Sequence, residues 1–143
     1  MVEKKNAKYF VTADKPDLEL PDYRLETAPD QVKRIVHLDA DTVPGTEFYS
    51  EAMWILPGAD KEIRKVESHI HPFSEFIGFF GFDYDDIQGL GAEIEFTVDN
   101  ETHIITKSFG AFSPAGVQHG PLIIRNIKRP IMCFTGGDCE KYE

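Results

Sequence analysis

The stretch His69-Ile70-His71-Pro72-Phe73-Ser74-Glu75 decides how this chain is interpreted, together with the later stretch Pro114-Ala115-Gly116-Val117-Gln118-His119. His69 and His71 are two residues apart, so on a strand both side chains point to the same face. Glu75 follows after a short turn, and the final histidine of the second stretch follows a Pro-x-Gly turn that ends one strand and directs the next. Three of the five histidines therefore lie where two strands and a turn can bring them to one metal ion.

The segments between the 11 glycines and 9 prolines are short and rich in β-branched and aromatic residues. The Asp99-Asn100 pair between two alternating runs predicts a hairpin turn. Many short strands joined by tight turns favour an antiparallel sandwich or barrel. The strands that we predict cover residues 33–38, 47–56, 61–71, 75–82, 92–98, 103–109, 119–125 and 131–135.

The first part of the chain differs from the rest. Roughly the first 30 residues are polar and carry Pro16, Pro21 and Pro29. They are either an arm that packs outside the barrel, as an edge strand of it or of a second subunit, or a disordered tail. We therefore divide the chain into residues 1–40, an N-terminal arm with the first strand, and residues 41–143, a single barrel domain.

Composition narrows the class of protein. With 143 residues, 41% of them hydrophobic, the chain is large enough for one packed domain. A net charge of −10 argues against binding to nucleic acid or to an anionic membrane surface. No apolar run reaches the ~20 residues of a membrane helix, and the N-terminus lacks the apolar core of a secretory signal. Cys133 and Cys139 fit no zinc pattern, so a cytoplasmic protein is expected.

Both stretches resemble the two sequence motifs of the cupin superfamily. The first motif runs G-x5-H-x-H-x3,4-E-x6-G, and the second runs G-x5-P-x-G-x2-H-x3-N. The histidines and the glutamate of the first, and the proline, glycine and histidine of the second, are all present. The departures lie at the flanking positions: Ile63 replaces the leading glycine, Gly81 is one residue early, Gly110 is two residues late, and Ile123 replaces the asparagine.

The resemblance implies an all-β double-stranded β-helix, or jelly-roll barrel, that holds one divalent metal ion, such as Fe, Mn, Zn or Ni. It implies that the ligands are His69, His71, Glu75 and His119. Three neutral imidazoles and one carboxylate leave a divalent ion with a net charge near +1 and with exchangeable positions. The family's reactions on small metabolites include dioxygenation, decarboxylation, isomerisation and lyase chemistry. A small organic acid is the substrate class that we expect.

Two other functions stay open. The barrel can hold a metabolite without converting it, as a sensor or storage module does, or the metal can serve only to brace the fold. We expect a small-molecule ligand and a homodimer, because antiparallel barrels of this kind often pair through exposed edges.

Alternation along the strands suggests which side chains line the barrel beside the metal. Counting in twos from Glu75 places Phe79 on its face, and counting from His119 places Arg125 on the same face as that histidine. Arg125 either points inward, where it could hold a substrate carboxylate, or lies at the surface, where arginines are more common. His37 and His103 are more simply explained as structural residues. The candidates for substrate binding are Arg125, Phe79, Tyr49 and Met53.

Overall fold

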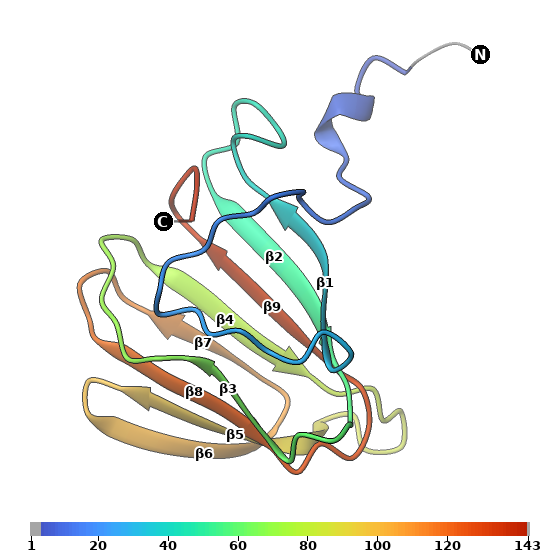
Figure 1. Cartoon of the computed structure of the whole chain (residues 1–143), viewed down its shortest axis with the longest axis vertical. Coiled ribbons are helices and arrows are strands. Elements are labelled where there is room, and N and C mark those ends of the chain that lie inside the picture. Colours follow the sequence, from blue (N-terminus) through green and yellow to red (C-terminus); the bar gives the residue numbers. More distant parts are fainter. Residues whose placement is uncertain (1–3, 143) are drawn as a thin grey trace.

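The computed structural model describes residues 4–142, which form two antiparallel sheets packed face to face (Figure 1). One sheet has the strand order β1-β2-β9-β4-β7 and the other has the order β3-β8-β5-β6. No helix within the described residues is long and apolar enough to span a membrane. The elements are η1 (Ala7–Tyr9), β1 (Val32–Leu38), β2 (Tyr49–Ile55), β3 (Glu62–Val66), β4 (Glu75–Phe80), β5 (Gly89–Val98), β6 (Glu101–Lys107), β7 (Phe109–Ser113), β8 (His119–Arg125) and β9 (Ile131–Gly137).

This architecture confirms the jelly-roll prediction, with two differences in the strands. The predicted strand at 103–109 is broken at Ser108, so that β6 and β7 belong to different sheets. The predicted strand at 61–71 stops at Val66, and both of its histidines lie beyond its end. The hairpin turn is confirmed, with Asp99 and Asn100 at φ values of 48° and 63°.

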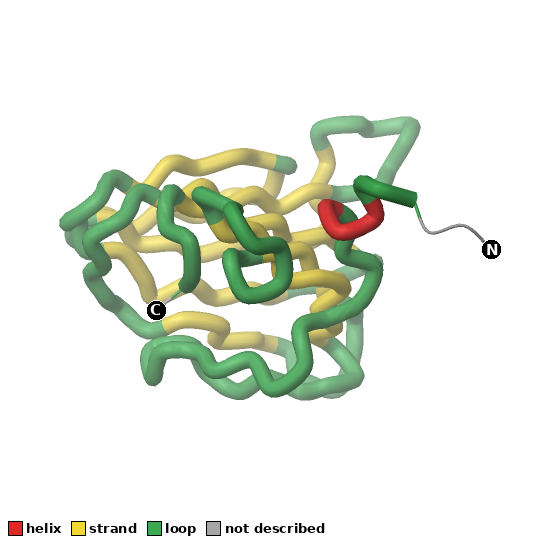
Figure 2. The backbone as a smooth tube through the Cα atoms, turned by 90° about the horizontal axis from the view of Figure 1, so that it is seen from above, coloured by secondary structure: helices red, strands yellow, loops and turns green. Residues whose placement is uncertain are grey.

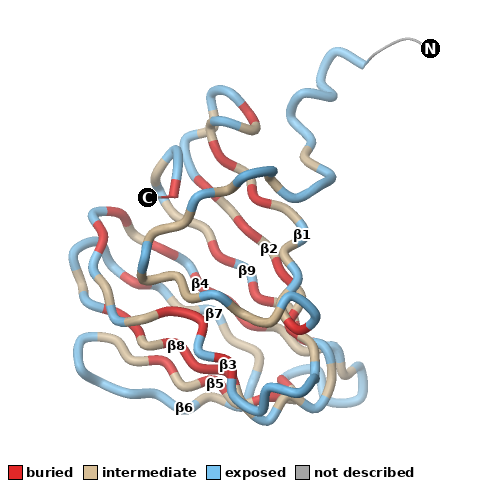
Figure 3. The backbone as a smooth tube through the Cα atoms, viewed as in Figure 1, coloured by how far each residue is buried: buried red, intermediate tan, exposed pale blue. Residues whose placement is uncertain are grey.

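The core lies between the inward faces of the two sheets. Strand β5 alternates cleanly, because Leu90, Ala92, Ile94 and Phe96 are buried while the residues between them are partly exposed. Figure 3 shows buried residues concentrated on the central strands and exposed residues along the edge strand β6 and in the loops. Period-two burial of apolar side chains therefore holds the sheets together.

The N-terminal arm packs against the barrel at residues 23–25. Arg24 forms a β-bridge with Val66, the Leu25 amide donates to the Lys65 carbonyl (3.0 Å), and the Glu67 amide donates to the Tyr23 carbonyl (2.9 Å). In Figure 1 the arm crosses in front of the strands, and Figure 2 shows loops surrounding the strands with η1 near the N-terminal end of the molecule. This part of the arm thus lies along the edge strand β3. A place at the edge of the barrel is one of the alternatives considered for the arm.

Candidate metal centre

Two segments bring three imidazole rings together. His69 and His119 form an isolated antiparallel bridge, with backbone N···O distances of 2.9 and 3.0 Å in the two directions. The ring centroid of His119 lies 4.1 Å from that of His69 and 4.6 Å from that of His71. One ring nitrogen from each histidine falls within 4.8 Å of the other two. This spacing is one that a single metal ion can bridge.

The protonation of these rings is set by the backbone. Each Nδ1 lies within hydrogen-bond distance of a backbone carbonyl, so it carries the proton and leaves the Nε2 lone pair free. All three Nε2 atoms are buried and have no hydrogen-bond partner among the described residues. Buried polar atoms are rarely left unpaired in this way, so the donor set fits a divalent metal ion. The accepting carbonyls are those of Glu67 (2.7 Å, from His69), Phe73 (2.8 Å, from His71) and Val117 (3.0 Å, from His119).

Glu75 lies beside the histidines at the start of β4. Its Oε1 atom is 3.8 Å from Nε2 of His71 and 3.7 Å from Nε2 of His119, while its Oε2 accepts a hydrogen bond from the Tyr49 hydroxyl. Burial raises the pKa of Glu75, but the neighbouring rings of His119 and His71 and the Tyr49 hydroxyl outweigh burial and lower it to about 2. The carboxylate is therefore ionised, with one oxygen held by Tyr49 and the other directed at two imidazoles.

Aromatic rings hold two of the imidazoles in place. Tyr23 stacks on His69 at 3.7 Å between centroids, and Phe73 stacks on His71 at 3.8 Å, each with an interplanar angle of 4°. Burial, together with the other two histidines, lowers the pKa of His69 to about 4. The ring is therefore neutral, as metal binding requires, throughout the physiological pH range.

A small cavity adjoins the cluster inside the barrel. Its volume is about 20 Å³, which is room for one water-sized group. Tyr142, near the C-terminus, and Arg24, from the arm, form part of its wall. The cavity is lined by Arg24, Lys65, Val66, His69, Glu75, Ile77, Phe96, His119, Leu122, Thr135 and Tyr142.

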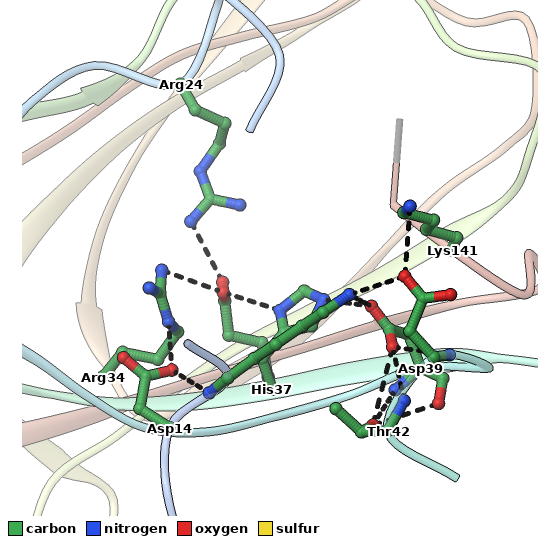
Figure 4. Close-up of polar contacts among 10 residues, drawn as sticks. Asp14, Arg24, Arg34, His37, Asp39, Thr42 and Lys141 are labelled. Carbon is green, nitrogen blue, oxygen red and sulfur yellow. Dashed lines mark hydrogen bonds and ion pairs between the residues drawn. The ribbon is translucent and has the colours of Figure 1, made fainter. Parts of the chain in front are cut away.

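A network of ion pairs occupies the neighbouring part of the interior (Figure 4). Arg24, Arg34 and His37 all approach the carboxylate of Glu51, at 3.0, 3.5 and 3.1 Å. Burial raises the pKa of Glu51, but the hydrogen bond with His37 and the charge of Arg24 hold it well below its usual range. The other side of His37 faces Asp39 at 3.3 Å, and that carboxylate also pairs with Lys15 at 2.7 Å.

The four residues predicted to bind substrate fall in different environments. Tyr49 is fully buried, and its hydroxyl donates a hydrogen bond to the Glu75 carboxylate that faces the histidines. Phe79 is fully buried in the apolar core, where it stacks with Phe109. Met53 also belongs to the core and does not line the cavity beside the histidines. Of these three side chains, only Tyr49 reaches the cluster.

The prediction that Arg125 shares a face with His119 is wrong. The register between β5 and β8 changes at this point: Phe96 pairs with Leu122, whereas Val98 pairs with His119. Two residues along β5 therefore correspond to three residues along β8. The extra residue in β8 is a bulge, and it reverses the alternation after His119. Arg125 therefore lies on the outer face, in a group of ion pairs with Glu62 (3.4 Å), Glu93 (3.1 Å) and Glu95 (3.3 Å). His103 is likewise exposed and pairs with Glu101.

Sequence reasoning missed four residues near the cluster, of which three are buried and Arg24 is largely buried: Arg24, Glu51, Lys65 and Tyr142. Two of them had a signal, because Glu51 alternates with Tyr49 on β2 and Lys65 alternates with Ile63 on β3. The other two lie outside the strands, where no periodicity applies.

No family model and no curated protein sequence matches the chain, whereas solved structures do. An oxalate oxidase in complex with glycolate has a TM-score of 0.56 at 14% identity, covering 95% of this chain and 62% of that chain. A cupin-superfamily sugar phosphate isomerase from Silicibacter pomeroyi has a TM-score of 0.52 at 17% identity, covering 84% and 67%. A predicted oxalate decarboxylase from Thermotoga maritima has a TM-score of 0.50 at 16% identity, covering 81% and 90%.

The chain thus spans about 62% of the length of the oxalate oxidase chain that it matches. At these identities the likeness concerns the fold, and it agrees with the two sequence stretches around His69 and His119. The fold of this chain is a jelly-roll barrel similar to that of the cupin-superfamily isomerase.

Proposed function

We propose that this chain binds one divalent metal ion through His69, His71, Glu75 and His119 and acts as a metal-dependent enzyme on a small organic acid. The observation that carries the proposal is the set of three buried Nε2 atoms that share one small space and have no hydrogen-bond partner among the described residues. A satisfied core histidine uses both ring nitrogens, whereas these rings use only Nδ1.

The surrounding residues prepare this centre for an anionic ligand. An ion bound there polarises a coordinated oxygen atom and, where it is redox-active, also exchanges electrons. Tyr49 keeps its proton, because burial and the charge of Glu75 raise its pKa, and it therefore orients Glu75 by donation. Tyr23 and Phe73 cover two rings and exclude water from them. With only one carboxylate among the four proposed ligands, the centre keeps a net positive charge that attracts an acid.

The reaction belongs to the group that includes oxidation, decarboxylation, isomerisation and lyase chemistry on such an acid. Oxalate oxidase and the predicted oxalate decarboxylase, by their names, act on a small dicarboxylate, and this is the substrate class that we propose.

The first test measures metal content in protein purified without an affinity column. The wild type should hold about one divalent ion per chain, and His71→Ala and His119→Ala should each lose it, because a ligand is removed. His103→Ala is the matched control, since this histidine lies exposed on β6. Metal retained by both ligand variants, or absent from the wild type under all loading conditions, would refute the proposal.

A second candidate is a metal that only braces the barrel, and the small volume of the cavity favours it. The two candidates differ in whether the ion has exchangeable positions. In Mn²⁺-loaded protein, added azide should change the electron paramagnetic resonance spectrum if such a position exists. An unchanged spectrum at full metal occupancy would instead favour the structural role.

A further inference from the structure

We propose that Lys65 binds the charged end of a small carboxylate ligand beside the metal centre, with Thr135 as a second donor. This inference rests on the proposed metal centre, and it names the residue that selects an anion there. Lys65 lies on β3, outside the two histidine stretches.

Lys65 is a buried lysine with no carboxylate of the described residues within ion-pair distance. Its exposed fraction is only 4%, yet no carboxylate among residues 4–142 lies within 4.0 Å of its ammonium group. The other deeply buried cation, Arg24, pairs with Glu51 at 3.0 Å. Lysine is almost never fully buried unless it is paired, because moving an unpaired charge out of water is costly. Such a group is best explained by a ligand that is present when the protein works.

The path of β3 places this side chain at the cavity. The pairing of β3 with β8 shifts between Arg64 and Val66, so Lys65 is the extra residue of a bulge. Its backbone carbonyl accepts the Leu25 amide of the arm, and both Lys65 and Val66 are buried and line the cavity. The bulge thus directs two consecutive residues of β3 into the barrel.

The cavity joins Lys65 to the metal side of the barrel. His69, Glu75 and His119 line it on one side, and Lys65, Arg24 and Thr135 also contribute to its wall. The Thr135 hydroxyl is buried and has no hydrogen-bond partner among the described residues. An ammonium group and an unpaired hydroxyl are the donors that a carboxylate accepts from.

The charges around the cavity favour an anion. Burial and the nearby guanidinium of Arg24 lower the pKa of Lys65, and they outweigh the opposite effect of Glu51 and Glu75, so the charged form of the lysine is disfavoured while the cavity holds no anion. An anion between Lys65 and the positively charged metal centre would relieve this cost on both sides. The volume of about 20 Å³ is room for about one water-sized group, so only the smallest carboxylates are expected to reach Lys65.

The test is calorimetric titration of Mn²⁺-loaded protein with glycolate and with its neutral analogue glycolamide. Loss of a charged hydrogen bond of this kind corresponds to a change of about 10- to 100-fold in affinity. We expect Lys65→Met to bind glycolate about 10- to 100-fold more weakly at unchanged manganese content. Lys107→Met, which changes an exposed lysine on β6, should match the wild type.

Glycolamide gives a second measurement that needs no variant, and it should bind the wild type more weakly than glycolate by a similar factor. Equal affinities for the two ligands, or full glycolate affinity in Lys65→Met, would overturn the proposal while leaving the metal centre in place. A loss of manganese from Lys65→Met would also overturn it, because the lysine would then act on metal binding. Absence of manganese from the wild type would instead refute the proposed function itself.

Discussion

The barrel contains one histidine in an ion-pair network, His37, and a cluster of three others, and the two regions differ in how the ring nitrogens are paired. In the ion-pair network, His37 lies between Glu51 at 3.1 Å and Asp39 at 3.3 Å, and each carboxylate has a further cationic partner. In the histidine cluster, by contrast, three Nε2 atoms without a hydrogen-bond partner among the described residues face one another, and Glu75 lies 3.7–3.8 Å from two of them. Burial alone therefore does not mark a functional histidine. What distinguishes the cluster is the set of unpaired atoms that face one shared space.

Strand β2 connects the two groups. Glu51 and Tyr49 are neighbours on its inward face, and Glu51 anchors the network while Tyr49 donates to Glu75. The rings of Tyr49 and His37 lie 6.0 Å apart. The comparison therefore predicts that changes in the network alter stability, whereas changes at the cluster alter metal binding.

The largest effect should follow from Glu51→Ala. The change leaves Arg24 buried without its partner, and breaking a buried ion pair in this way costs about 3–5 kcal/mol of unfolding free energy. Chemical denaturation of metal-free protein measures this loss. The control Glu95→Ala removes a partly exposed partner of Arg125 and should cost at most about 1 kcal/mol. If folded Glu51→Ala protein fails to hold metal, the division between the two groups breaks down.

A smaller effect is expected from Tyr49→Phe. The carboxylate of Glu75 loses the donor that orients it, and changes to groups of this kind typically weaken metal affinity by about 10- to 100-fold. Competition with a chromogenic chelator measures the affinity. Tyr84→Phe, at an exposed tyrosine, should leave it unchanged. Unaltered affinity in Tyr49→Phe would show that the hydroxyl serves packing only.

The smallest effect concerns pH and belongs to the network alone. Because the pKa of Glu51 is lower in the folded chain than its ordinary value of 4.5, its contribution to stability is complete above pH 4.5 and declines as the pH falls below it. The stability difference between wild type and Glu51→Gln should therefore be constant above that pH and shrink in acid. Denaturant titrations at several pH values test this. A difference that grows on acidification would contradict it.

The fold was largely predictable because its signals are local. Alternation and turn residues indicated most strands, and the spacing of the three histidines predicted the cluster that the structure brings together. The break at Ser108 was missed because no glycine or proline marks it, and only the pairing of β6 and β7 with different sheets separates them.

The residues around the cluster were less predictable, because β-bulges and segments outside the strands determine which side chains reach it. The bulge in β8 sends Arg125 outward; Gly120-Pro121, directly after His119, is a signal for it that simple alternation ignored. Arg24 and Tyr142 reach the cavity from opposite ends of the chain, so their proximity depends on the completed barrel.

The enclosure of the cavity by Arg24 and Tyr142 determines how a ligand can enter it. Arg24 and Tyr142, which help to enclose the cavity, belong to segments outside the strand ladders, and such segments generally detach at a lower free energy than a central strand does. Detachment of either segment would therefore admit a ligand while both sheets stay intact. Amide hydrogen exchange should accordingly be faster at residues 20–25 and 139–142 than in β2, β9 or β4.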